Sequence, residues 1–196
     1  MSREASWDDV FGDLDMRVLD HGQRLDWIND RIHRRLRGKN WAALSAGDEG
    51  QLAWDAAMRT FVEGIWVASI SCCHVVCERE VAGVLTASDA RINGELPKSW
   101  ERRGLGGLLT LVRQHDVLPP DLIDEVQSVA EVRRPYGHWR STIDEESLRT
   151  RVRAEHELTG NTDFANLVQR LVVRDATQSM ETTIKLYFGS YGLGGP

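Results

Sequence analysis

Three arginines and one histidine crowd around a proline between two apolar stretches of the chain. They are Arg133, Arg134, Arg140 and His138, and the proline is Pro135. Histidine gives and takes a proton near neutral pH, and arginine can hold a phosphate through a fork of N–H donors. These groups suit RNA cleavage without a metal. His138 would accept the proton of a 2′-hydroxyl as that oxygen attacks the next phosphate, and Arg133 would stabilise the charge that builds there. The product would carry a 2′,3′-cyclic phosphate.

The same residues also have a purely structural interpretation, which composition alone favours. Arg133 and Arg134 would cap the C-terminal carbonyls of a helix, and His138 would tether the loop that follows. The wider segment 133–153 carries six arginines against three acidic residues, so an anion could bind here. The residue types leave both interpretations open.

Two other motifs do not indicate a site. The glycines of 104–107 lack the Gly-Lys-Ser/Thr ending of a phosphate-binding loop and follow no predicted strand. Cys73, His74, Cys77 and Glu78 lie close together on one predicted helix, but a closed zinc site needs four ligands, usually from two elements. No second cluster of cysteine or histidine is present in the sequence. We therefore expect core cysteines, no metal and no cofactor.

A basic run at residues 31–37 also has two interpretations. Its arginines could form a phosphate-binding arm. However, acidic residues dominate at 4–20 and basic residues at 24–39. One long helix uses this arrangement to complement its macrodipole, so we favour the helix.

Composition and charge are typical of a globular protein of the cytoplasm. Of 196 residues, 41% are hydrophobic and 28% are charged, and the net charge of −6 gives no global reason to expect nucleic-acid binding. The longest uncharged apolar stretch, 64–77, is too short to cross a membrane, and the N-terminus lacks the apolar core of a secretory signal. All three cysteines lie within residues 72–77, which fits a reducing compartment.

Apolar residues recur every three or four positions, which predicts an all-α, antiparallel bundle of about five to six helices. The middle of the second helix is apolar nearly all round, which marks the central helix and predicts a buried Trp66. Pro135 should end the fourth helix near Arg133, because the residue before a proline is pushed out of the α region. The expected helices span 7–37 (with a kink at Gly22 and a stop at Gly38), 48–85, 104–115, 119–133, 144–158 and 163–188.

These elements divide the chain into three parts. Residues 1–40 form a long N-terminal helix that packs on the bundle, residues 48–188 form the bundle, and the Gly-rich residues 189–196 form a flexible tail. Within the bundle, Ser141-Thr142 with Glu145 resembles a capping signal for the fifth helix.

The spacing Arg133-x4-His138, set between such helices, resembles the Arg-x4-6-His signature of the HEPN superfamily. These are helical domains of toxin–antitoxin, abortive-infection and other RNA-processing systems. Residues 104–140 are similar to the stretch that leads into the family's motif, and residues 61–85 look like its earlier bundle helix with its Glu. The resemblance covers roughly residues 60–188. It implies a HEPN-like bundle in which Arg133 and His138 are catalytic. The supporting or RNA-binding residues would be Arg134, Tyr136, Arg140 and Glu78.

Two details qualify the match. Arg151 and Arg149 also precede His156 at the required spacing, but they lie inside one continuous predicted helix. Five residues of helix turn about 500°, so Arg151 and His156 would point to different faces. The position after the motif arginine, commonly Asn, Asp or His in the family, is here Arg134.

Three functions therefore follow as hypotheses. The first is a metal-independent endoribonuclease, a toxin or defence effector whose site forms across a homodimer and which has an antitoxin or other protein partner. The second, which Arg134 favours, is a non-catalytic HEPN-like module that binds RNA or protein. The third is a structural interaction bundle with no nucleic-acid role, which the net charge favours.

Overall fold

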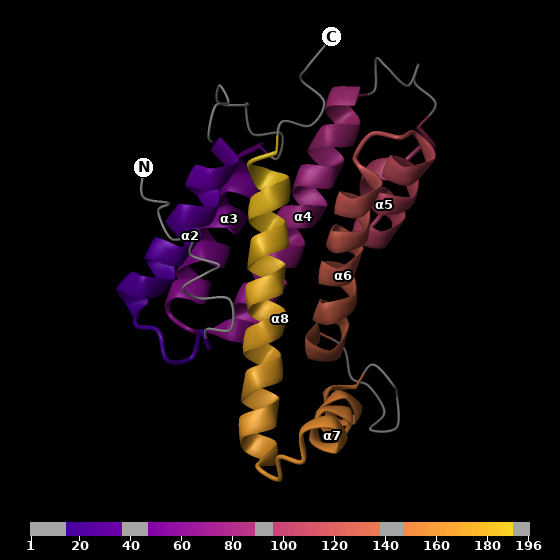
Figure 1. The fold of residues 1–196 in the computed structure, drawn as a ribbon. Helices are drawn as coiled ribbons and strands as arrows, with labels where there is room; N and C mark the ends of the chain where they lie inside the picture. The colour runs from indigo at the N-terminus through magenta and orange to yellow at the C-terminus, as the bar shows by residue number, and fades with distance from the viewer. Residues whose placement is uncertain (1–14, 37–46, 89–95, 138–146, 190–196) are drawn as a thin grey trace, which may run out of the picture.

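The computed structural model describes residues 15–36, 47–88, 96–137 and 147–189, and these residues are helical with no strand among them (Figure 1). The all-α expectation is confirmed. Seven α-helices lie within these ranges. They are α2 (His21–Leu36), α3 (Gly47–Val62), α4 (Trp66–Ser88), α5 (Leu105–Gln114), α6 (Pro120–Gly137), α7 (Leu148–Thr159) and α8 (Phe164–Tyr187), and a short 3-10 turn, Trp100–Arg102, precedes α5.

The helix predicted over 48–85 is two helices, so that prediction was wrong. The chain turns between α3 and α4 at Gly64, whose φ of 76° lies in the left-handed region that favours glycine. A Cβ at this position would also lie 3.0 Å from Nη1 of Arg24. The apolar pattern runs through the break without interruption, and a single glycine is tolerated inside many helices. Periodicity therefore could not locate the turn.

The first predicted helix is also shorter than expected within the described residues. Residues 15–20 form a turn, and α2 begins at His21 instead of continuing from residue 7. Asp20 accepts a hydrogen bond from the backbone N–H of Gln23 (2.8 Å), and the Gln23 side chain accepts one from the backbone N–H of Asp20 (3.0 Å). This reciprocal pair is a capping box, a start signal that the apolar periodicity does not show. Residues 1–14 and Gly38 lie outside the described residues.

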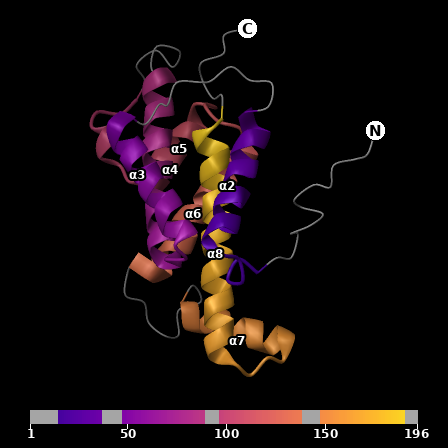
Figure 2. The ribbon, with the colours of Figure 1, turned by 90° about the vertical axis from the view of Figure 1, so that its left-hand side faces the viewer.

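The central position of α4 is confirmed. This helix packs against α3, α5, α6 and α8, and Figures 1 and 2 show α3 and α8 beside it. Its inward side chains, among them Ile70, Val76 and Val81, are completely buried. Trp66 is only half-buried, and the fully buried aromatic residue is Phe61 of α3, whose ring stacks on Trp27 with 5.4 Å between centroids.

The last two helices agree with the sequence to within a few residues, except at the start of α7. Ser147 caps that helix by accepting a hydrogen bond from the N–H of Thr150. The predicted signal at residues 141–145 lies outside the described residues. The long helix α8 runs the length of the bundle, and α7 lies at its lower end (Figure 1). None of the described helices is long and apolar enough to span a membrane.

Candidate site at the end of α6

Helix α6 continues through Pro135 to Gly137, so the prediction that it ends near Arg133 was wrong. Proline removes one N–H and crowds the carbonyl four residues earlier. Here that cost falls in the last helical turn, only two residues before the helix ends. Because Tyr136, the next residue, is fixed by a buried contact, the turn keeps its helical form.

The contact that fixes this turn is a buried cluster around Asp175 of α8. Asp175 is 2% exposed and accepts three hydrogen bonds. Tyr136 donates to its Oδ2 (2.8 Å), and Arg151 of α7 donates to Oδ2 (2.7 Å) and Oδ1 (2.6 Å). Burial, with the nearby Asp175 carboxylate, raises the pKa of Tyr136 well above its ordinary value. The Tyr136 hydroxyl therefore has a structural role, because it donates its hydrogen bond to Asp175 and not to a ligand.

Arg133 lies one turn before the end of α6 and folds toward that end. A Cβ built on Gly137 would lie 3.0 Å from both Cζ and Nε of Arg133, so the glycine leaves room for the guanidinium group beside the last turn. The following residue, Arg134, is exposed. The two arginines thus occupy different surroundings, although they are neighbours in sequence.

A histidine on α4 shares this region with Arg133. His74 is half-buried, and burial lowers its pKa below the ordinary value; the positive charge of Arg133 lowers it further, and Glu78 opposes the shift. Its imidazole is therefore mainly neutral at pH 7, the form that can accept a proton. Arg133 and Glu78 therefore both lie near enough to His74 to act on its charge.

Glu78 has a clear structural role. Its Oε2 accepts a hydrogen bond from the backbone N–H of Leu105 at 3.0 Å, the first residue of α5. The residue at the N-cap position is Gly104, which has no side chain to supply this bond. Glu78 therefore caps α5 and ties it to α4, and a carboxylate at a helix N-terminus also complements the helix dipole.

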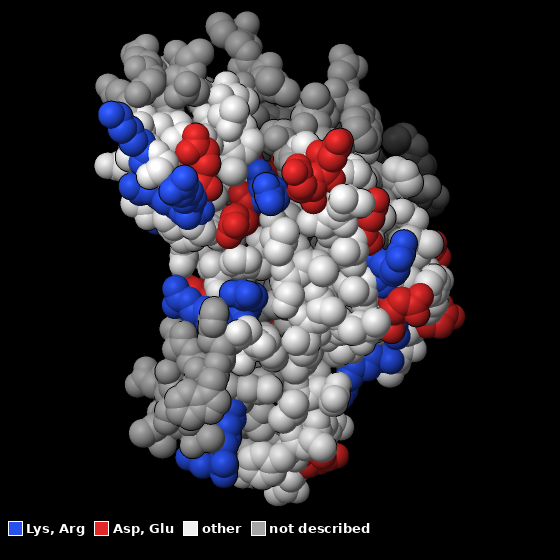
Figure 3. Space-filling model, turned by 180° about the vertical axis from the view of Figure 1, so that it is seen from behind, with Lys and Arg blue, Asp and Glu red and all other residues white. Residues whose placement is uncertain are grey.

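Basic side chains gather along the edge of the bundle on which α5, α6 and α7 lie. Figure 3 shows the molecule from behind, and a column of Lys and Arg follows this edge. The exposed cations that these elements and the turn before α5 contribute are Arg102, Arg103, Arg113, Arg134, Arg149 and Arg153. The end of α6 thus lies within a basic edge, although the whole chain has a net charge of −6.

The other arginine and histidine residues with the required spacing lie on α7, and they make separate contacts. Arg151 binds Asp175, whereas His156 has its Nδ1 2.7 Å from the carbonyl oxygen of Asn161 and its ring 5.1 Å from that of Phe164. The expectation that Arg151 and His156 point apart agrees with these contacts. They do not form a joint site.

The cysteines lie in the core, as expected. Cys73 and Cys77 are completely buried, and burial raises the pKa of each thiol to about 12. Within the ranges that the structure describes, no group of three or more His, Cys, Asp or Glu side chains could hold a metal ion.

The structure brings together only part of the predicted site. Arg133 and Glu78 each lie near His74, Tyr136 belongs to the Asp175 cluster, and His138 and Arg140 lie outside the described residues. From the sequence, His74 stands out only as a possible metal ligand. Its position one helical turn before Glu78 was the available signal for a shared face. Asp175 gave no such signal, because only packing reveals its partners.

Comparison with known proteins adds no relative: no family model, curated protein or solved structure matches this chain.

Proposed function

We propose that this chain is a HEPN-like endoribonuclease that cleaves single-stranded RNA without a metal, at a site built on Arg133 and His138. The observation that carries the proposal is the end of α6: a buried three-way contact fixes the last turn, and Arg133 lies on that turn beside a half-buried histidine. A fixed cation can stabilise charge as it develops on a phosphate without first reorganising.

The chemistry needs a base, a cation and access for a negatively charged polymer. His138 would take the proton of the 2′-hydroxyl, and Arg133 would hold the phosphate that this oxygen attacks. The basic edge over α5, α6 and α7 would attract the RNA backbone and hold it against the end of α6. Tyr136, Arg151 and Asp175 would keep the catalytic arginine in place without touching the RNA.

Arg133→Lys should abolish most of the cleavage, because lysine keeps the charge and loses the planar fork of donors. The assay incubates purified protein with labelled single-stranded RNA in EDTA and identifies the 2′,3′-cyclic phosphate by mass spectrometry. Wild-type cleavage should persist in EDTA, since the base and the cation replace a metal-bound water. Arg59→Lys is the matched control, because Arg59 is exposed on α3 and plays no part in the proposed site. Cleavage by wild-type protein that stops in EDTA would contradict the proposal.

A non-catalytic RNA- or protein-binding module is the second candidate, and Arg134 favours it. This exposed arginine stands where related motifs commonly carry Asn, Asp or His, a residue that helps to orient the site in the family. Arg134→Asn separates the two functions. Cleavage that appears only in this variant would mean that the natural chain is an inactive or weakened relative that still binds RNA.

The resemblance also implies a composite site across a homodimer. We therefore expect light scattering at micromolar concentration to give twice the 22.1 kDa mass of one chain. A two-fold dimer uses the same surface on both subunits, and so could place two Arg133–His138 pairs in one cleft. A mass of 22.1 kDa at all concentrations would exclude the composite site, while RNA binding by the single chain would remain open.

A toxin or defence effector is the biological role that we propose for this activity. An antitoxin would then be the protein partner, and it would keep the enzyme from cleaving RNA of the same cell. A neighbouring gene for a nucleotidyltransferase-like antitoxin would support this role.

A further inference from the structure

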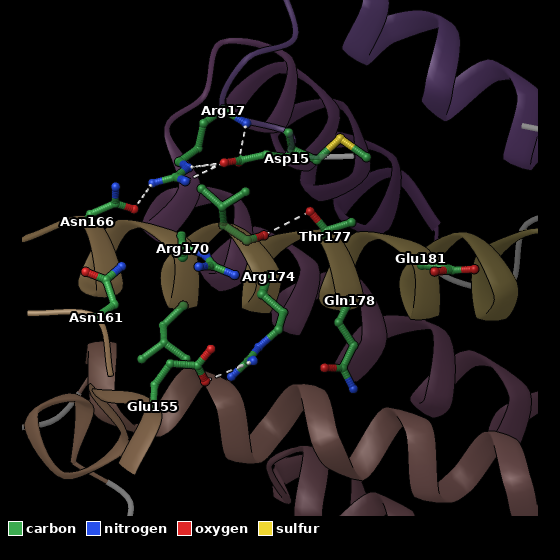
Figure 4. A pocket seen from close by; sticks show the side chains of 13 residues that line it. Asp15, Arg17, Glu155, Asn161, Asn166, Arg170, Arg174, Thr177, Gln178 and Glu181 are labelled. Carbon is green, nitrogen blue, oxygen red and sulfur yellow. Dashed lines mark hydrogen bonds and ion pairs between the residues drawn. The ribbon is translucent and has the colours of Figure 1, made fainter. Parts of the chain in front are cut away.

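A long polar groove follows one face of α8. It consists of two hollows that share Glu181 as a wall. The larger has a volume of about 630 Å³ and lies between α8, the end of α7 and the turn at residues 15–17 (Figure 4). The smaller has a volume of about 280 Å³ and lies between α8 and α2, which run side by side in Figures 1 and 2.

A stripe of polar side chains forms the floor of both hollows. These residues are spaced three or four apart on α8, so they share one face of the helix. They are Arg170, Arg174, Gln178, Glu181 and Lys185. The stripe runs from Arg170 to Lys185, 15 helical steps, or about 22 Å at 1.5 Å per step. The groove is thus elongated, and it lies open at the surface.

Cations dominate the lining of the groove. Besides those on the stripe, Arg17 stands at one end, and Arg31, Arg34 and Arg35 of α2 face the other. The two hollows together are lined by seven Lys and Arg side chains and only three acidic ones, Asp15, Glu155 and Glu181. Three arginines of the basic run that the sequence left with two interpretations, Arg31, Arg34 and Arg35, thus line the smaller hollow together with Lys185 of α8.

Several of these cations are held in place by contacts with neighbouring side chains. Arg17 binds Asp15 and donates from Nη1 to Oδ1 of Asn166 at 2.9 Å. At the other end of the groove, Arg31 lies over the ring of Trp27, 4.8 Å from its centroid, and Arg34 binds Asp30 at 2.9 Å. Such side chains lose little further freedom when they bind an anion.

Arg170 and Arg174 are the most available cations of the stripe. Arg174 is exposed, and its one described carboxylate, Glu155, is 3.4 Å away. Arg170 is also exposed, and among the described residues no carboxylate lies within ion-pair distance of it. In Figure 4 both guanidinium groups extend from α8 into the hollow.

We infer that this groove binds the phosphate backbone of a single-stranded RNA. The inference rests on the proposed RNA function and adds to it a second contact surface, separate from the end of α6. Arginine donors bind phosphate oxygens strongly and in pairs. A groove of about 22 Å would accommodate roughly six nucleotides of a stacked strand at about 3.4 Å each. An open, polar and elongated groove suits a polymer better than an enclosed small molecule.

The test measures RNA affinity as a function of salt. The probe is a fluorescein-labelled, twelve-nucleotide oligouridine with 2′-O-methyl groups, which block the attacking oxygen so that it cannot be cleaved. Each phosphate contact to a single strand contributes about 0.7 to the slope of log K against log salt concentration. Arg170→Gln combined with Arg174→Gln should therefore reduce the wild-type slope by about 1.4. The control Arg59→Gln removes one exposed cation from α3 and should leave the slope unchanged.

A variant that should bind RNA more tightly serves as a second test, because a gain in affinity cannot result from misfolding. Glu181→Gln removes the acid shared by the two hollows and keeps the shape of the side chain, so it should tighten RNA binding. Wild-type protein that binds RNA, with slope and affinity unchanged in the groove variants, would overturn the groove and leave the proposed function standing. Wild-type protein that does not bind the RNA at all would overturn both. If the groove variants lose affinity for a poly-glutamate peptide and not for RNA, the groove belongs to an acidic protein partner and the inference fails.

Discussion

Replacing His138 with alanine should slow RNA cleavage by about 10²- to 10⁴-fold, the usual contribution of a general base. In the sequence this residue directly follows Gly137, the last residue of α6, and comes five residues after Arg133. Single-turnover kinetics with saturating protein measure the effect on the chemical step, apart from RNA binding. His33→Ala, on the exposed face of α2, provides a control with the same loss of an imidazole.

His74→Ala distinguishes between two positions for the base. If His138 is the base, removing His74 should leave most of the rate, because His74 then acts only through its electrostatic effect on Arg133. Loss of the full 10²- to 10⁴-fold with His74→Ala and little loss with His138→Ala would move the base to α4. If neither variant changes the rate or the RNA affinity, residues 133–138 form only a helix end and the structural interpretation stands.

Asp175→Ala should destabilise the fold by about 3–5 kcal/mol, the cost of removing one partner from a buried ion pair. The change leaves the guanidinium group of Arg151 and the hydroxyl of Tyr136 without their shared acceptor. Urea denaturation followed by circular dichroism gives the free energy of unfolding. The matched control is Asp124→Ala, because Asp124 forms an exposed pair with Arg113 and should contribute at most about 1 kcal/mol.

A compensating variant tests whether the cost comes from stranded polar groups. Adding Arg151→Met and Tyr136→Phe to Asp175→Ala removes the two donors that lost their acceptor, so part of the lost stability should return. A triple variant that is less stable than Asp175→Ala alone would show that the size and packing of these side chains matter more than their hydrogen bonds.

The helices could be predicted wherever an apolar stripe has clear ends. The limits of α5 and α8 follow from Gly104, Asp163 and the apolar positions between their ends, and the structure places both within a few residues of the prediction. The errors came from signals that compete with the stripe. Gly64 breaks a continuous apolar pattern, and the capping pair of Asp20 and Gln23 begins a helix inside a longer periodic run.

The candidate site was predictable only in part, for a physical reason. The spacing of Arg133 and His138 is local, so a sequence pattern can show it. The neighbours that give Arg133 its surroundings come from α4, and the anchor of Tyr136 comes from α8, 39 residues further along the chain. Contacts of this kind depend on how the helices pack. Pro135 does not end α6 for the same reason, since a tertiary contact outweighs a local preference.

Helix α7 has a small apolar cluster of its own, in which Val152 packs with Leu167 and Leu171 of α8, apart from the main core. So small a cluster makes α7 a natural unit of local unfolding, with amide protons that exchange faster than those of α4. Each such opening withdraws Arg151 and leaves Asp175 with one of its three hydrogen bonds. The bond that remains is the one from Tyr136, so the opening of α7 weakens the anchor of the end of α6 on α8 without breaking it.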